Sequence, residues 1–224
     1  MSENESILKN LSLEYEQRFA GKEANRIRVW SILVKHYFQN LIGDDKIILD
    51  LGCGYGEFIN QILAKEKYGM DLNPDSPKFL NQNVEFLRQD CSEPWDLPEA
   101  SLDVVFTSNF FEHLPNKSLL SKTLFEANRC LRPGGRIVCM GPNIKFLPGA
   151  YWDFWDHFLE LTDLSLAEGL RLHGFEIETR IDKFLPYTMS DKTPPADWLI
   201  RLYVRFPILW RLKGRQFLVI GKKI

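Results

Sequence analysis

The chain has 224 residues, which suits one large domain because single cores rarely grow beyond ~250–300 residues. Hydrophobic residues make up 45% and charged residues 26%, a balance that excludes a disordered or collagen-like protein. The 28 lysines and arginines nearly match the 30 acids, and a net charge of −2 gives no reason to expect a nucleic-acid partner.

The cysteines and the amino terminus indicate the cellular compartment of the protein. Cys53, Cys91, Cys130 and Cys139 form no C-x-x-C pair, so we expect no structural metal and a reducing environment. The first residues are polar and acidic, unlike a secretory signal, and no run of ~18 apolar residues suggests a membrane span. These features favour a cytoplasmic protein.

Taken in chain order, short β-branched runs alternate with segments of helical period. Apolar residues between Asn25 and Leu41 predict a helix that stops at Gly43. Further helices are predicted over 57–64 and 119–131. Strands are predicted over 46–51, 67–71, 84–89, 102–108, 136–140, 175–181 and 216–221. This order predicts an α/β fold built from parallel β-α units.

A glycine-rich turn follows the first strand, at Gly52, Gly54 and Gly56, where the backbone can turn sharply and approach a ligand. Asp71 ends the second strand, where an acid can accept from both hydroxyls of a ribose, although Asp-Leu-Asn-Pro is also turn chemistry. Asp90 follows the third strand. It can accept from an adenine amine, with the Cys91 amide beside it, or it is a solvated loop acid.

The glycine spacing argues against phosphate-rich ligands. Gly-x-Gly-x-Gly differs from the dinucleotide pattern, because Glu57 stands where that pattern has its third glycine. There is also no Gly-Lys-Ser/Thr to hold a triphosphate. A ligand with ribose and adenine but no phosphates fits better.

These motifs together resemble the class I S-adenosylmethionine-dependent methyltransferases, in the small-molecule branch that includes quinone-biosynthesis enzymes. The resemblance rests on 50–56 (Asp-Leu-Gly-Cys-Gly-Tyr-Gly), 69–71 (Gly-Met-Asp), 89–90 (Gln-Asp), 109–114 (Asn-Phe-Phe-Glu-His-Leu) and 131–135 (Leu-Arg-Pro-Gly-Gly). It covers 47–142 strongly and the remainder by topology. It implies a Rossmann-like, mostly parallel sheet of seven strands with helices on both faces, whose last strand inserts antiparallel beside the fifth.

The resemblance also implies S-adenosyl-L-methionine as cofactor and assigns residues to it. Those expected to bind the cofactor are Asp50, Gly52, Cys53, Gly54, Gly56, Asp71, Leu72, Asp90, Cys91 and Asn109. Asp50 and the glycines would hold the methionine part and Asp71 the ribose. Asp90 with Cys91 would hold the adenine, and Asn109 would stand near the transferring methyl. A methyl on a sulfonium is already activated, so the enzyme mainly has to align the acceptor.

A general base is needed where the acceptor must lose a proton, and histidine suits that role near neutral pH. His113 follows the fourth strand, although a histidine at such a helix start often only fixes a loop. His157 lies in a segment with six aromatic residues between Phe146 and Phe158, which predicts either a pocket wall or a flap packed on the sheet. We rank His157 above His113. Substrate contacts are expected from Tyr151, Trp152, Trp155 and Asp156.

The segment 197–213 is basic and apolar. From Asp191 onward, eight lysines and arginines face two aspartates. Either this segment folds over the substrate pocket and packs on the aromatic flap, or it makes peripheral membrane contact with its arginines and tryptophans at headgroup level.

The sequence thus predicts one methyltransferase domain over 1–224. It comprises a helical cap (1–45), a cofactor-binding core (46–143), an aromatic substrate flap (144–165) and a basic apolar insertion (190–215). We expect methyl transfer to an oxygen, with carbon or nitrogen less favoured, of a small-molecule or lipid- or sugar-linked acceptor. The alternatives are a non-catalytic protein that binds S-adenosylmethionine and a nicotinamide-dependent oxidoreductase. Nothing in the pattern specifies an oligomeric state.

Overall fold

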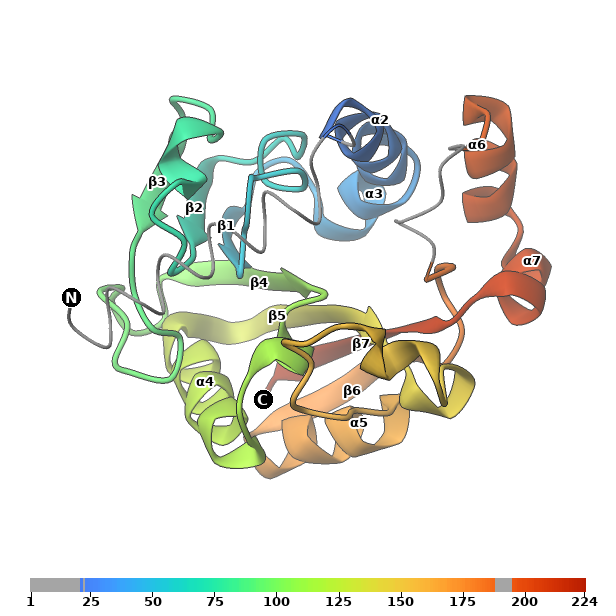
Figure 1. The fold of residues 1–224 in the computed structure, drawn as a ribbon. Coiled ribbons are helices and arrows are strands. Elements are labelled where there is room, and N and C mark those ends of the chain that lie inside the picture. Colours follow the sequence, from blue (N-terminus) through green and yellow to red (C-terminus); the bar gives the residue numbers. More distant parts are fainter. Residues whose placement is uncertain (1–20, 22, 188–194) are drawn as a thin grey trace.

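A computed structural model of the chain describes residues 21, 23–187 and 195–224, so the first part of the expected cap and of the expected insertion lie outside the described residues. It shows a seven-stranded sheet in the order β3-β2-β1-β4-β5-β7-β6 (Figure 1). The strands are β1 (Ile47–Leu51), β2 (Glu66–Met70), β3 (Val84–Leu87), β4 (Leu102–Ser108), β5 (Leu131–Pro142), β6 (Phe175–Ile181) and β7 (Gln216–Lys223). The first five run parallel, and β7 runs antiparallel to both β5 and β6. The predicted fold is confirmed.

Helices cover both faces of the sheet (Figure 1). They are α2 (Glu23–Leu33), α3 (Gln39–Ile42), α4 (Lys117–Cys130), α5 (Asp163–Leu172), α6 (Asp197–Arg205) and α7 (Pro207–Lys213). The strand β1 shows why both faces need cover: Ile48 packs into the cluster under α2, α6 and α7, whereas Leu49 and Leu51 pack into the cluster under α4 and α5. A strand buried on both sides is typical of parallel sheets.

The predicted helix from Asn25 to Leu41 forms as α2 and α3 joined by one π turn at Val34–Phe38. A π turn adds one residue to a helical turn and so changes which of the following residues face the sheet. Here Trp30 and Phe38 lie 6.1 Å apart between ring centroids, and both pack on Phe106 of β4. The helix ends at Gly43, as predicted, with a φ of 93°.

The predicted helix over 57–64 is wrong, because this segment forms a series of turns. Its carbonyls are satisfied from outside: the buried Lys67 ammonium of β2 donates to the carbonyls of Ile59 and Ile62 at 3.0 and 3.1 Å. The side chains of Phe58, Ile59 and Ile62 remain buried against the sheet. The apolar spacing therefore identified the buried face correctly but not the backbone.

The segment 197–213 forms two helices and not one, because Pro207 cannot continue α6 and holds Phe206 in an extended conformation. The helix α6 packs on α2 and the π turn. Arg28 of α2 pairs with Asp197, and the Tyr203 hydroxyl donates to the carbonyl of Phe184 at 2.7 Å. Burial of this segment against the aromatic flap, the first of the two alternatives, is not the arrangement that the structure shows for α6.

A buried ionic cluster fixes the base of the aromatic flap. Asp163, the fully buried first residue of α5, accepts from Lys145 at 2.8 Å, from Asn143 at 3.0 Å and from Arg180 of β6. Burial would raise the pKa of this carboxyl, but the three donors hold it below its usual value. The cluster joins the end of β5, the flap and β6.

We expect Asp163→Ala to lower the free energy of unfolding by about 2–3 kcal/mol, because charge-assisted hydrogen bonds are lost. Urea unfolding at neutral pH would measure this. The deficit should shrink as the pH falls below the unfolded aspartate pKa of ~3.9, because the lowered folded pKa contributes stability only above it. Asp153→Ala, at an exposed position of the same flap, is the matched control; an equal loss in both variants would contradict the role of the cluster.

Candidate active site

The carboxyl ends of β1, β2 and β4 meet at one edge of the sheet, where ligands of open α/β folds bind. The glycine turn lies at this edge, with positive φ at Gly52 (72°), Gly54 (52°) and Gly56 (77°). A Cβ on Gly52 would lie 2.3 Å from the ring of Phe110, so both the backbone angle and the space require glycine. The amides of Gly52 and Cys53 donate to the carbonyl of Met70 at 2.9 and 3.1 Å.

Asp71 joins the glycine turn to the end of β2. One of its carboxylate oxygens accepts from the amide of Gly54 and the other from the amide of Asn73, both at 2.8 Å. Burial raises the pKa of Asp71, against these backbone hydrogen bonds, which lower it. Each carboxylate oxygen keeps acceptor capacity, so Asp71 can support the turn and also accept from ribose hydroxyls.

Asp50, at the end of β1, is 3% exposed and adds a second carboxyl to the same place. Burial, together with the charges of Glu57 and Asp71, holds the pKa of Asp50 well above its usual value. Glu57 accepts from the Arg26 guanidinium of α2 at 2.6 Å. A cationic ligand beside these acids would favour their charged forms, and a sulfonium with an α-amino group is such a ligand.

The sequence did not predict the pairing of Arg26 with Glu57. This ion pair connects the helical cap to the glycine turn. The signal available was a basic residue near the start of an amphipathic helix and an acid just after the third glycine, and neither specifies the other as its partner.

The residues expected near adenine lie at the ends of β2 and β3. Asp90 is exposed and accepts from the amide and the hydroxyl of Ser92, both at 2.8 Å, which is a local turn. The Cys91 side chain is buried, and burial raises the pKa of its thiol to about 12. Leu72 is 39% exposed beside Asp71. The roles of Asp90 and Cys91 toward adenine, and of Leu72 toward the cofactor, stay predictions.

Asn109 follows β4 with a φ of 49°, a left-handed conformation that asparagine adopts more readily than most residues. Its amide donates to the Met140 carbonyl at 2.9 Å, and its side-chain nitrogen contacts the Ser108 hydroxyl at 3.2 Å. The chain therefore turns sharply after the strand and leads directly into Phe111–His113, a short 3-10 turn.

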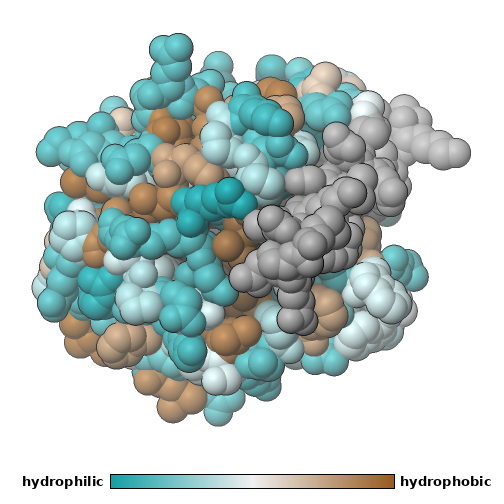
Figure 2. Space-filling view, turned by 60° about the vertical axis from the view of Figure 1, so that its left-hand side comes forward, coloured by the Kyte–Doolittle hydropathy of each residue, from teal (hydrophilic) through white to brown (hydrophobic). Residues whose placement is uncertain are grey.

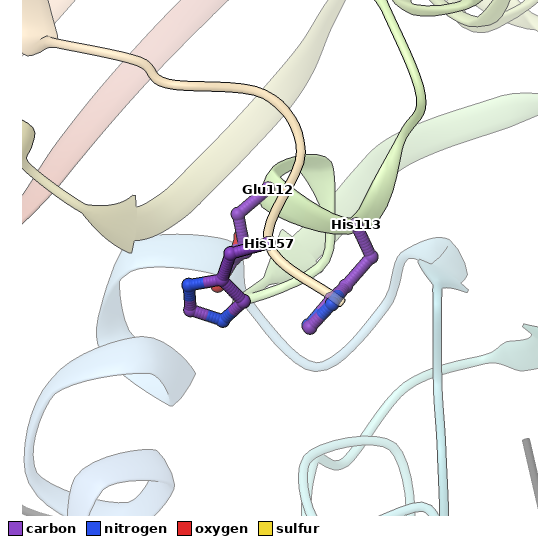
Figure 3. A group of neighbouring side chains, drawn as sticks. All are labelled: Glu112, His113 and His157. Carbon is purple, nitrogen blue, oxygen red and sulfur yellow. The ribbon is translucent and has the colours of Figure 1, made fainter. Parts of the chain in front are cut away.

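Glu112, His113 and His157 lie together at this edge (Figure 3), each with one nitrogen or oxygen within 4.8 Å of the others. The imidazole rings are 5.0 Å apart between centroids. Glu112 is buried, and it is the site residue that sequence reasoning passed over, although it directly precedes His113. Two imidazoles and a carboxylate can transfer protons, and they are also donors that could hold a zinc or iron ion.

The two histidines differ in what their Nδ1 atoms contact. In His157, Nδ1 lies 2.9 Å from the carbonyl of Tyr151, and since a carbonyl can only accept, this nitrogen carries the proton. In His113, Nδ1 lies 3.0 Å from the Asp156 carboxylate and also 3.0 Å from the Asp156 backbone carbonyl. Burial lowers the pKa of His113, but Asp156 and the charge of Glu112 raise it, and the net result is a raised pKa.

The aromatic flap divides into buried and exposed residues. Tyr151 is fully buried, and its hydroxyl donates to the Leu159 carbonyl at 2.5 Å. Trp152 and Trp155 are 52% and 90% exposed. Asp156 contacts His113, as described above. The amides of Phe158 and Leu159 donate to the Glu112 carbonyl at 2.8 and 3.1 Å, so the flap is fixed to the turn after β4.

Known proteins share part of this sequence and its fold. Residues 49–139 match the methyltransferase-domain family. An S-adenosylmethionine-dependent methyltransferase of Mycolicibacterium smegmatis is 32% identical over 145 residues, which are 61% of this chain and 54% of that protein. The 2-methyl-6-phytyl-1,4-hydroquinone methyltransferase of Synechocystis is 27% identical over 171 residues, covering 66% and 50%. The chain thus spans about half the length of these curated relatives.

Among solved structures, an S-adenosylmethionine-dependent methyltransferase of Thermotoga maritima superposes with a TM-score of 0.67 at 15% identity, covering 98% of this chain and 99% of that one. The sheet and its acidic, glycine-lined edge define a Rossmann-like α/β domain. More narrowly, residues 49–139 match a methyltransferase domain, and the relative and the fold neighbours that the chain resembles are S-adenosylmethionine-dependent methyltransferases, whose cofactor is S-adenosyl-L-methionine. These similarities favour a methyltransferase over the oxidoreductase alternative.

We expect Asp71→Ala to weaken binding of S-adenosylhomocysteine by about 1.5–3 kcal/mol, because a charged acceptor for the ribose is lost. Isothermal titration calorimetry would measure the change. Asp96→Ala, at an exposed acid beyond β3, should bind like the unaltered protein. Since Asp71 also holds the Gly54 amide, circular dichroism must show that the variant is folded. Unchanged affinity would contradict the assignment of Asp71.

Proposed function

We propose that the protein transfers the methyl group of S-adenosylmethionine to an oxygen of a small-molecule or lipid-linked acceptor. The observation that carries this proposal is the position of an oriented histidine pair beside the acidic glycine turn of a methyltransferase domain. The bound cofactor supplies an activated methyl on a positively charged sulfur. The protein's task is to bind, to orient and to remove a proton.

The glycine turn and the strand ends hold the cofactor in this proposal. Asp50 and the backbone of Gly52 and Gly54 face its cationic methionine part, and Asp71 accepts from its ribose. Burial raises the pKa values of Asp50 and Asp71, and a sulfonium ligand beside these carboxyls would favour their charged forms, which supports this assignment. Asn109 stands at the turn that separates this region from the histidines.

His157 acts as the general base. With its proton on Nδ1 and held by the Tyr151 carbonyl, a neutral ring has its lone pair on Nε2, which can take the hydroxyl proton of an acceptor. His113 is the less suitable base, because its contact with Asp156 favours the protonated ring. A protonated His113 would instead stabilise negative charge on the acceptor oxygen as its proton leaves.

The acceptor class follows from the base and from the flap. A base is required for a hydroxyl or phenol, which favours oxygen over carbon or nitrogen as the methylated atom. The Synechocystis relative is named for a hydroquinone that bears a phytyl chain, which supports an acceptor joining a polar ring to an apolar tail. Trp152 and Trp155 of the aromatic flap are exposed and, with Asp156, offer mixed apolar and polar contacts for such a molecule, whereas the buried Tyr151 contributes by holding His157.

We expect His157→Ala to lower kcat by about 10²–10⁴-fold, the usual contribution of a general base, with little change in S-adenosylhomocysteine affinity. Transfer of a labelled methyl to a panel of phenols and long-chain hydroquinones would measure it. His173→Ala, at the end of α5, is the matched control. Activity that survives in His157→Ala would exclude this base, and loss of activity with a chelator would point to a metal at the same three side chains.

The pH profile separates the two histidines. If His113 were the base, the rate would rise with pH through its raised pKa, and Asp156→Asn would shift that rise to lower pH, because the partner that raises the pKa is removed. If His157 is the base, the midpoint should stay where it is in Asp156→Asn. Cofactor binding with no transfer to any acceptor of the panel would instead favour the non-catalytic binding protein.

A further inference from the structure

The helix α6 is apolar on two opposite faces. One face is buried, with Ile200 and Val204 in the core cluster beside α2. The other carries exposed apolar side chains one helical turn apart, Trp198 by 63% and Leu202 by 41%, and Phe206, directly after the helix, is exposed by 46%. A helix that only packs on its own domain needs one apolar face. The second face therefore has another use.

Basic side chains lie next to the exposed apolar ones. Arg201 and Arg205 line a surface hollow together with Trp198, Leu202 and Phe206. The next helix, α7, has the same kinds of exposed side chain: Ile208 is 61% and Leu212 is 72% exposed, and Arg211 and Lys213 are also exposed. The one acid within 197–213 is Asp197, which already pairs with Arg28. We call this the α6–α7 surface.

The α6–α7 surface contrasts with the side of the molecule that faces forward in Figure 2. On that side hydrophilic residues predominate and hydrophobic ones are interspersed in small groups. Scattered single apolar residues are normal on a soluble domain, whereas a contiguous exposed group marks an interaction site. No helix among the described residues is long and apolar enough to cross a membrane, so any lipid contact here is made from the surface.

We propose that the α6–α7 surface docks on a bilayer that contains anionic lipid. Aromatic and aliphatic side chains can enter the boundary between headgroups and acyl chains, while the long arginine side chains reach back to the phosphates. Anionic headgroups attract each cation near the membrane, and four exposed cations lie on this surface, Arg201, Arg205, Arg211 and Lys213. A bilayer satisfies both the apolar and the cationic groups at once.

The position of this surface connects it to the active site. Arg215, just after α7, donates to the Phe146 carbonyl at 2.6 Å, and the Lys183 ammonium lies 4.3 Å from the centre of the Phe146 ring, at the beginning of the aromatic flap. In Figure 1, α7 and the flap lie beyond the same ends of β4 and β5. Docking would bring the flap to the membrane, where an acceptor with an apolar tail is dissolved. This link to the acceptor rests on the proposed methyl transfer.

The test is co-sedimentation of the full chain with phosphatidylcholine vesicles, with and without phosphatidylglycerol, in low and high salt and without cofactor. We expect binding to the anionic vesicles that weakens as salt rises. Arg201→Glu/Arg205→Glu should weaken it at least about tenfold, since two favourable charges become unfavourable. Trp198→Ser/Leu212→Ser should also weaken it while the charges are kept.

Lys117→Glu/Lys122→Glu is the matched control, with the same charge change at exposed positions of α4. It should bind like the unaltered protein. No binding of the unaltered protein to anionic vesicles would overturn the proposal, and so would an equal loss in the α4 variant, because binding would then follow net charge alone. Calorimetry with S-adenosylhomocysteine on the same samples reports the cofactor site separately, so a failure of one proposal does not imply failure of the other.

Discussion

The hydrogen bond from the Gly54 amide to the Asp71 carboxylate is the interaction on which the geometry of the site depends. It joins the turn after β1 to the end of β2, two neighbouring strands whose carboxyl ends face the same edge. Together with the bonds from the Gly52 and Cys53 amides to the Met70 carbonyl, it sets the distance between the glycine turn and the acid that follows β2. The same carboxylate is then both a structural acceptor and a candidate for binding ribose, so the two interpretations of Asp71 are not exclusive.

The electrostatics of this edge follow from the same proximity. Burial and the charges of Glu57 and Asp71 raise the cost of charging Asp50, and the Arg26 guanidinium contacts Glu57. A cation bound beside these acids would lower the free-energy cost of ionising Asp50. Methyl transfer removes that positive charge from sulfur, so the acids would hold the cationic reactant more strongly than the neutral product, which assists product release.

Much of the fold could be predicted because its signals are local. Strand β1 was recognisable from an apolar run ending in Asp50, and glycine spacing identified the turn after it. Contacts between segments far apart in the sequence could not be predicted, because residue spacing carries no signal for them. Nothing in the spacing shows that His113 and His157 come within 5.0 Å, or that Asp156 contacts one ring and the Tyr151 carbonyl the other. The helix predicted over 57–64 failed for a related reason, since its carbonyls accept from Lys67 of a neighbouring strand.

The place of β7 in the sheet has a consequence for how the chain folds. This strand lies between β5 and β6, yet it is made after both of them and after α6 and α7. During synthesis, β5 therefore ends the parallel half of the sheet with an open edge, and β6 has no partner until Gln216 and the residues beyond it emerge. Nascent chains that stop short of this strand would expose two unsatisfied edges, and these would attract chaperones or join with each other.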